Sequence, residues 1–232
     1  MNEIELSVII PVKNEGGNIE FLLRSLREAL DELGMEHEII VVDGNSEDDT
    51  VPRAQSLADR LIVQSEGGYG SALKEGFAAA RGKFILTMDG DLSHPTDFIK
   101  SIYRKRDEAD LLIASRYIEG GKAEMPAWRK ALSRILNAAF SALLSLPIRD
   151  ISSGFRLYRS EVLRRLELKN RDFSILEEIA IKMWNRGERI EEIPFIYRPR
   201  RSGRSKIKLL QFGKSYLVTA YSMWRLKRRG ED

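Results

Sequence analysis

Apolar residues follow two alternating patterns along the first half of the chain. Continuous, mostly β-branched runs predict buried strands over residues 6–12, 38–43, 61–64, 83–88 and 111–114. Between them, apolar residues at helical spacing predict helices over residues 19–33, 51–58 and 72–80. Strand and helix therefore alternate, which is typical of an α/β fold whose mostly parallel sheet is flanked by helices.

The second half has a different pattern. It predicts an apolar helix over 131–146, strands over 151–158 and 189–197, a helix over 175–186 between them, and a closing helix over 209–227. A loop rich in Pro, Arg and Gly, RPRRSGRSK, precedes the closing helix. We expect one catalytic domain over residues 1–202, followed by a basic amphipathic segment over 203–232.

Charge is distributed unevenly along the 232 residues. Residues 198–232 hold 11 Lys or Arg against 2 acids, whereas residues 1–197 hold 27 against 33. Such a tail suits an anionic partner or a solvated helix end, and charge alone leaves both open. The chain has no cysteine, which excludes disulfides and thiolate chemistry and suits the cytoplasm. The N-terminus lacks signal-peptide features, and the longest uncharged stretch, residues 135–148, is shorter than the roughly 20 residues needed to span a bilayer.

The stretch LTMDGDLSHP places Asp89 and Asp91 one residue apart, directly after a predicted strand. Residues i and i+2 of an extended segment point the same way, and Gly90 between them lets a ligand approach closely. Two neighbouring carboxylates repel unless a cation lies between them, so the pair suits Mg²⁺ or Mn²⁺. A turn with Asp at its capping positions is the plain alternative. The position at a strand's carboxyl end, where α/β sheets bind ligands, favours the metal.

Polar residues also follow the first two predicted strands. Lys13 and Glu15 follow the first, and Asp43 follows the second. An acid at a strand end can hold a ribose hydroxyl, although Asp43 serves equally well as a helix-entry residue. The glycines of GGYG before a helix indicate a tight turn more strongly than a phosphate site.

Taken together, SVIIPVKNE, EIIVVDGNSEDDT, GGYGSALKEGFAAARG and DGDLSHP resemble the GT-A fold glycosyltransferases of family 2. ASRYIEGG, RKALSRILN, DISSGFRLYRSEVL and RSGRSK resemble its polyprenyl-phosphate branch, of the dolichyl-phosphate mannose synthase type. The resemblance implies a Rossmann-like GT-A domain and metal-dependent, inverting transfer of mannose from GDP-mannose to dolichyl (polyprenyl) phosphate. Transfer from UDP-glucose or another UDP-sugar, or to a sugar hydroxyl, remains the alternative.

The same resemblance implies the site residues. The nucleotide sugar would contact Pro11, Lys13, Glu15, Val41, Asp43, Asp89, Gly90, Asp91 and Lys206. The metal would be held by Asp89, Asp91 and Ser93, and the acceptor phosphate by Arg129, Ser133 and Arg200. Asp91, Arg129, Ser133 and Arg200 would be the catalytic residues. Three positions depart from the family: Ser93 stands where Gln is common, Gly44 where a second acid is common, and Lys13 where an aromatic residue is common.

The acceptor decides whether a catalytic base is needed. Arg129 and Ser133, four residues apart on a predicted helix, share a face and can offer phosphate a planar fork and a hydroxyl. A polyprenyl phosphate is largely ionised near pH 7, since its second pKa is about 6, and needs no base. A sugar hydroxyl would need one, and Glu177 and Glu178 are the candidates.

The closing helix combines Trp and Tyr on one face with Lys and Arg around it. This pattern suits a helix lying in the lipid headgroup layer, and equally a helix packed on the protein body. We expect a peripheral protein on the cytoplasmic face of a membrane, with a small membrane partner subunit as a possible companion. We expect no nucleic-acid partner, because the tail lacks regularly spaced aromatic residues for base stacking.

Overall fold

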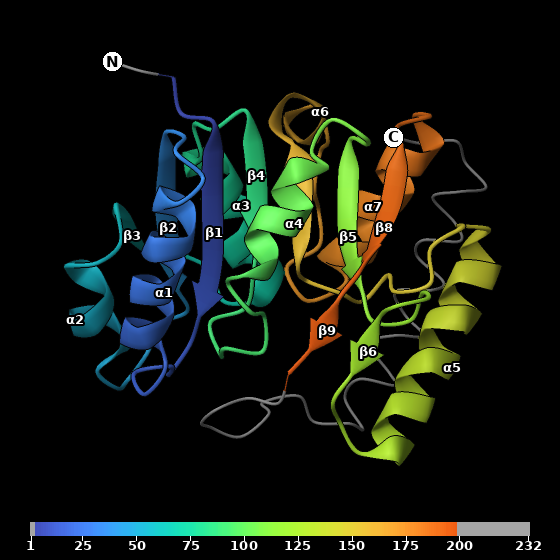
Figure 1. Ribbon diagram of the computed structural model, residues 1–232, viewed down its shortest axis with the longest axis horizontal. Helices are drawn as coiled ribbons and strands as arrows, with labels where there is room; N and C mark the ends of the chain where they lie inside the picture. The colour runs from blue at the N-terminus through green and yellow to red at the C-terminus, as the bar shows by residue number, and fades with distance from the viewer. Residues whose placement is uncertain (1–2, 199–232) are drawn as a thin grey trace.

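The fold is built around a seven-stranded sheet. The structure is a computed structural model, and it describes residues 3–198. The strands lie in the order β3-β2-β1-β4-β7-β5-β8 (Figure 1). Their bounds are β1 Leu6–Val12, β2 His37–Asp43, β3 Arg60–Val63, β4 Phe84–Thr87, β5 Leu111–Ser115, β7 Arg156–Arg159 and β8 Ile190–Pro194. Every pairing is parallel except those of β7 with β4 and β5, so the prediction of a mostly parallel sheet is confirmed.

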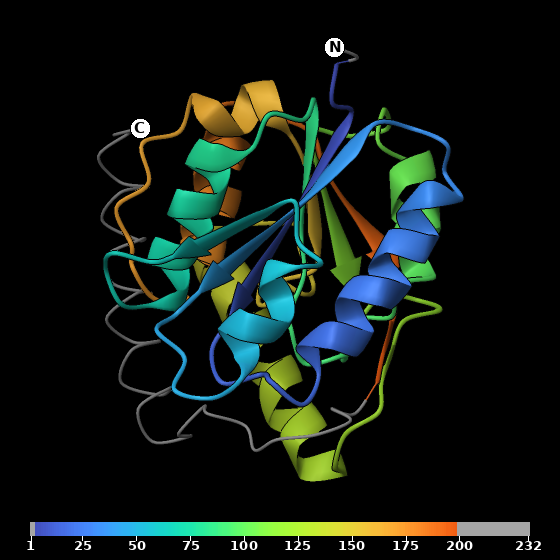
Figure 2. The same ribbon diagram turned by 90° about the vertical axis from the view of Figure 1, so that its left-hand side faces the viewer.

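Helices cover both faces of this sheet, which explains the continuous apolar runs of the central strands. One face carries α1 (Ile19–Asp31), α2 (Thr50–Gln55) and α4 (Phe98–Arg104), and the other carries α3 (Tyr69–Ala79), α6 (Ser160–Arg164) and α7 (Ile175–Asn185) (Figure 2). Along β1, Val8 and Ile10 pack on the α1 side, whereas Ile9 packs on the α3 side. All three side chains are fully buried.

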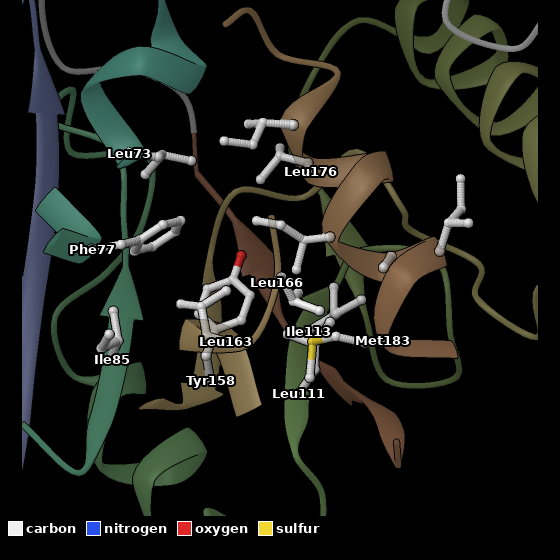
Figure 3. Packing of buried hydrophobic residues seen from close by; sticks show 14 of the residues in the cluster. Leu73, Phe77, Ile85, Leu111, Ile113, Tyr158, Leu163, Leu166, Leu176 and Met183 are labelled. Atoms are coloured by element: carbon white, nitrogen blue, oxygen red, sulfur yellow. The ribbon is translucent and has the colours of Figure 1, made fainter. Parts of the chain in front are cut away.

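The core on the α3 side joins distant parts of the chain. Figure 3 shows Phe77 of α3 and Tyr158 of β7 approaching one another, with Leu163 and Leu176 of the two later helices beside them. The two rings meet edge to face at 5.8 Å and 70°. Such pairs add to the free energy already gained from burying their area. The core therefore fixes α7 against the sheet, and α7 carries part of the site described below.

A small second sheet and a long helix complete the fold. β6 (Lys122–Ala123) pairs in parallel with β9 (Ile196–Tyr197), and α5 (Ala127–Leu144) follows β6 (Figure 1). Buried side chains on α5 are few, and Phe140 and Leu144 belong to the core on the α3 side. None of the helices between residues 3 and 198 is long and apolar enough to cross a bilayer.

Two details differ from the predictions. Residues 151–155 form a turn rather than a strand, because the buried Arg156 donates to the carbonyl oxygens of Ile151 and Ser153. The helices α4 and α6 were not predicted. The predicted closing helix lies outside the described residues.

Candidate functional site

The carboxyl ends of β1, β2 and β4 meet at one edge of the sheet. Val12, the last residue of β1, pairs with Asp43, the last residue of β2. Gly90, just beyond β4, lies against both Val12 and Glu15. A Cβ atom at Gly90 would lie 2.6 Å from Val12 Cγ1 and 3.7 Å from Glu15 Cγ. The structure thus brings the predicted metal-binding segment against the end of the first strand, as expected for a ligand site in an α/β sheet.

The DGD segment presents one partly exposed and one buried carboxylate. Asp89 is 36% exposed, whereas Asp91 is 3% exposed. Leu92 adopts a left-handed backbone conformation (φ 65°), which costs energy for a non-glycine residue and is found where a segment is held in a set shape. The turn lets the Ser93 N–H donate to Asp91 Oδ1 at 3.0 Å.

These oxygens fit a hard divalent cation. The Ser93 hydroxyl is buried and has no hydrogen-bond partner in the part of the chain that is described. Carboxylate and hydroxyl oxygens are the ligands that Mg²⁺ and Mn²⁺ prefer. No group of three or more His, Asp or Glu side chains suited to a metal occurs within residues 3–198. A cation held here would therefore draw further ligands from phosphate or water, as Mg²⁺ commonly does.

His94 lies behind the exposed carboxylate. Its ring is buried and stacks on Phe155 at 4.7 Å. The main-chain N–H of Asp89 donates to His94 Nδ1 at 2.9 Å, and His94 Nε2 lies 3.6 Å from Asp89 Oδ2. Burial lowers the pKa of His94, against the opposing effect of Asp89, so the ring is neutral at pH 7. Since Nδ1 accepts, the ring proton is on Nε2 and faces the carboxylate.

Only some of the residues predicted to contact the nucleotide lie where they could reach a ligand at the edge of the sheet. Pro11 is partly buried and Lys13 is exposed, both at the ligand edge of the sheet. The carboxylate of Asp43 accepts from the N–H and hydroxyl of Ser46, so it holds the turn after β2. Val41 is fully buried in the core on the α1 side, which does not support its predicted contact with the base. Lys206 lies outside the described residues.

A pocket of about 190 Å³ adjoins this edge. It brings together Asp89, Arg129 and Ser133, which the sequence places on separate elements. Its lining residues are Tyr69, Asp89, His94, Arg116, Met125, Arg129, Leu132, Ser133, Leu136, Asn137, Ser152, Ser153, Gly154, Phe173, Leu176, Glu177, Phe195 and Tyr197. The Ser133 hydroxyl accepts from Tyr117 Oη at 2.7 Å. Arg200, the third residue expected at the acceptor phosphate, lies outside the described residues.

Arg116 adds a buried cation to the pocket wall. Asp150, which is fully buried, binds its guanidinium at 2.7 Å through each carboxylate oxygen and also accepts its main-chain N–H at 2.9 Å. Against the opposing effect of burial, Asp150 raises the pKa of Arg116. The arginine therefore stays charged, and Ser152 accepts from it at 3.0 Å. The SRY sequence alone did not assign it a role, because its partner lies 34 residues further along the chain.

Tyr69 is a pocket residue that the sequence analysis missed. Its ring stacks on Phe173 at 4.3 Å and 14°. A Cβ atom at Gly154 would lie 2.7 Å from the Tyr69 hydroxyl and 3.5 Å from Asp89 Oδ1, so all three residues meet at one point. The tyrosine inside the GGYG motif was the available signal, but the motif was interpreted from its glycines alone, as a tight turn.

The structure separates the two glutamates at the start of α7. Glu178 accepts the main-chain N–H groups of Lys169 and Asn170, both at 2.9 Å, and lies 3.2 Å from Lys182 Nζ. Glu177 instead lines the pocket and is 4% exposed. Its Oε2 has no hydrogen-bond partner among residues 3–198, and burial raises its pKa to about 7. Adjacent acids thus have different roles, which their spacing could not reveal.

The sequence of this chain is similar to those of known proteins. Residues 7–167 match the glycosyl transferase family 2 profile. This chain is 38% identical to a dolichol-phosphate mannosyltransferase of Pyrococcus furiosus. The similarity covers 97% of this chain but only 64% of the length of that relative. It is 33% identical to a polyprenol monophosphomannose synthase of Mycolicibacterium smegmatis, over 86% of this chain and 80% of that protein.

Solved structures agree with the fold. Glucosyl-3-phosphoglycerate synthase of Mycobacterium tuberculosis, in complex with Mn²⁺, uridine diphosphate and phosphoglyceric acid, superposes with a TM-score of 0.76. That similarity covers 95% of this chain and 78% of the other, at 21% sequence identity. The α/β sheet flanked by helices is therefore a shared architecture. Because the family profile covers most of the sheet and its ligand edge, this chain belongs to glycosyl transferase family 2.

Proposed function

We propose that this protein is an inverting glycosyltransferase that moves mannose from GDP-mannose to dolichyl phosphate or another polyprenyl phosphate. One observation carries the proposal: Arg129 and Ser133 line the same pocket as Asp89. A pocket with a phosphate fork at one position and a metal-binding acid at another suits a phosphate acceptor beside a nucleotide donor. The printed names of the Pyrococcus and Mycolicibacterium relatives support the same reaction.

On the donor side, Asp89 and Asp91 would hold Mg²⁺ or Mn²⁺, with the buried Ser93 hydroxyl as a third oxygen. The cation would supply positive charge that stabilises the departing nucleotide diphosphate. His94 keeps the Asp89 carboxylate in place through the contacts described above. Mn²⁺ and uridine diphosphate in the glucosyl-3-phosphoglycerate synthase complex support metal dependence.

On the acceptor side, this chain's own residues position the nucleophile. The planar guanidinium of Arg129 and the hydroxyl of Ser133 would bind two phosphate oxygens, with Arg200 joining them. The ionised phosphate then needs orientation rather than deprotonation. Its attack opposite the leaving group inverts the sugar carbon, so an α-linked donor gives a β-linked lipid phosphate. Glu178 is occupied by Lys182 and two main-chain N–H groups, which fits a reaction without a base at that position.

The lipid chain would lie along α5. Trp128, Leu132, Ile135 and Leu143 expose 58%, 38%, 65% and 45% of their surface on this one helix. Exposed apolar residues so close to the phosphate site suit a lipid surface. We therefore propose a peripheral protein at a membrane, on the cytoplasmic face that the cysteine-free composition favours. Anchoring by the basic C-terminal segment and a small membrane partner subunit belong to this proposal.

A second candidate reaction is sugar transfer to a hydroxyl acceptor. Glu177 favours it, because a buried carboxyl with a pKa near 7 in the pocket suits a general base. In that case a UDP-sugar donor is also open, as uridine diphosphate glucose occupies a neighbouring structure of the Mycobacterium synthase.

One experiment separates these reactions. The full chain is incubated with Mn²⁺ or Mg²⁺, either a short polyprenyl phosphate or a water-soluble sugar acceptor, and radiolabelled GDP-mannose, UDP-glucose or UDP-GlcNAc. Label in the lipid phase and on the soluble acceptor is counted. We expect label only from GDP-mannose and only with the divalent cation, with Asp91→Asn as the inactive control. Label transferred only to a water-soluble sugar acceptor would contradict the proposed function.

A further inference from the structure

Glu177 carries a buried carboxyl group, and one of its two oxygens has no hydrogen-bond partner in the described part of the fold. It is 4% exposed, and its Oε2 has no hydrogen-bond partner anywhere in residues 3–198. Burying an unpaired polar oxygen costs free energy, and native proteins rarely leave one so without a reason. The neighbouring Glu178, at a similar depth, receives three partners. The fold therefore can satisfy a buried glutamate at this place, yet it leaves Glu177 Oε2 without a partner in the described residues.

The position of Glu177 narrows the class of ligand. It lines one pocket with Asp89 on the donor side and with Arg129 and Ser133 on the acceptor side. Tyr69 lies within electrostatic reach of both Asp89 and Glu177, and burial together with these acids raises the pKa of its hydroxyl well above its ordinary value. The phenol therefore keeps its proton and remains a hydrogen-bond donor.

A phosphate, a lipid chain and a sugar hydroxyl are the candidate partners of Glu177, and its chemistry disfavours the first two. The Glu177 carboxyl is partly ionised near pH 7, and in that form it would repel a phosphate, whereas a lipid chain would leave it unpaired. A sugar hydroxyl satisfies it, because a hydroxyl both donates and accepts and so pairs with either protonation state. Stacked Tyr69 and Phe173 add an aromatic wall beside it.

We propose that Glu177 binds a hydroxyl group of the transferred sugar and sets which sugar the enzyme accepts. This inference rests on the proposed function and adds its sugar subsite. A site that hydrogen-bonds one substrate hydroxyl can reject an analogue lacking that hydroxyl by up to about 10⁴-fold, because the buried partner is left unsatisfied. Glu177 would thus discriminate between donors that share one nucleotide.

The test measures sugar binding apart from nucleotide binding. Dissociation constants of GDP-mannose, GDP, UDP-glucose and UDP are measured calorimetrically with Mn²⁺ for the full chain, Glu177→Gln, Glu177→Leu and the exposed control Glu161→Gln. We expect Glu177→Leu to weaken the preferred nucleotide sugar about 100-fold and its nucleoside diphosphate less than twofold. Glu177→Gln, which keeps a hydrogen-bonding group, should lose about 10-fold or less, and the control should match the wild type.

A double-mutant cycle that pairs substrate analogues with the conservative variant Glu177→Gln provides a second test, which does not depend on Glu177→Leu folding well. GDP-mannose analogues that each lack one hydroxyl are titrated into the wild type and Glu177→Gln. We expect one analogue to lose affinity in the wild type and to lose much less in the variant. Equal losses for every analogue in both proteins would overturn the inference while leaving the proposed function standing. A wild type that binds neither nucleotide sugar would overturn both.

Discussion

His94 holds Asp89 at two points: Nδ1 accepts the Asp89 main-chain N–H at 2.9 Å, and Nε2 lies 3.6 Å from Asp89 Oδ2. The ring is itself fixed, since it stacks on Phe155 and meets Phe195 edge to face at 5.6 Å. Because Asp89 is proposed to bind the metal, His94 would orient a metal ligand without touching the metal. The aromatic core thus fixes the His94 ring, and the His94 ring fixes Asp89.

Replacing His94 should weaken metal binding more than folding. In His94→Asn, the amide oxygen can still accept the Asp89 N–H, but nothing faces the carboxylate. We expect Mn²⁺ affinity in the presence of GDP to fall about 10-fold or more, in line with outer-shell substitutions elsewhere. Electron paramagnetic resonance of free Mn²⁺ measures it. His94→Gln, whose longer amide can reach the carboxylate, is the matched variant and should lose less; equal Mn²⁺ affinity in all three proteins would refute the orienting role.

Arg129 and Ser133 should act on the acceptor and not on the donor. Arg129→Lys keeps the charge but loses the planar fork, and Ser133→Ala loses a hydroxyl that also accepts a hydrogen bond from the Tyr117 phenol. We expect the KM for polyprenyl phosphate to rise about 10-fold in each, with GDP-mannose affinity unchanged. Arg134→Lys, an exposed arginine on the same helix, is the control. A rise in the donor's dissociation constant with no change for the lipid would reverse the assignment.

Gly90 should tolerate no side chain. A Cβ atom there would lie 2.6 Å from Val12 Cγ1, closer than such atoms approach, so Gly90→Ala must move the DGD segment or the end of β1. We expect Mn²⁺-dependent nucleotide binding to fall at least 10-fold. Gly67→Ala is the matched control, because nothing lies within 4 Å of its added Cβ. Should Gly90→Ala bind nucleotide as the wild type does, the close contact between these segments is wrong.

The elements that sequence predicted best are those whose pattern has one physical reading. The runs in β1, β2 and β4 are continuous because both faces are covered, and the acids after them fall at one edge because parallel strands end together. Residues 151–155 misled because Ile151 and Phe155 read as strand, while the turn depends on hydrogen bonds from a buried arginine. No local sequence pattern predicts hydrogen bonds from a buried arginine side chain to these carbonyl oxygens.

The sequence did not show which individual residues of an element reach the site. Val41 and Asp43 occupy one strand, yet the structure places the first in the core and engages the second in its own turn. Glu177 and Glu178 are adjacent and chemically alike. Their different surroundings arise from the 168–172 segment, whose main-chain N–H groups meet only the second.

Glu178 should be a stability residue. Its carboxylate and Lys182 are 1% and 4% exposed, and removing one charge from a buried pair leaves the other uncompensated. We expect Glu178→Gln to lower the free energy of unfolding by about 3 kcal/mol, measured by urea denaturation. The variant that remains folded should still transfer sugar. A stable Glu178→Gln protein without activity would instead favour a hydroxyl acceptor with Glu178 as base.

Glu177 should make stability depend on pH in the opposite sense from an ordinary ion-paired acid. Its pKa is about 7 in the folded protein against an ordinary value of 4.5. Well below pH 4.5 both states are protonated, and Glu177 adds no pH-dependent cost. As the pH rises to 7 the unfolded chain ionises while the folded chain does not, so stability falls by up to about 3 kcal/mol.

Glu177→Gln removes this titration, so the variant should be more stable than the wild type at pH 8 and should approach it at pH 4.5. Urea denaturation of both proteins at several pH values measures the difference in their free energies of unfolding. His94 lowers the stability of both proteins below pH 6.5, so its effect cancels in that difference. If the difference does not change with pH, Glu177 is ionised in the fold and has a partner. A variant that is more stable and yet binds nucleotide sugar less well would show that the buried carboxyl is kept for the ligand, at the expense of the fold.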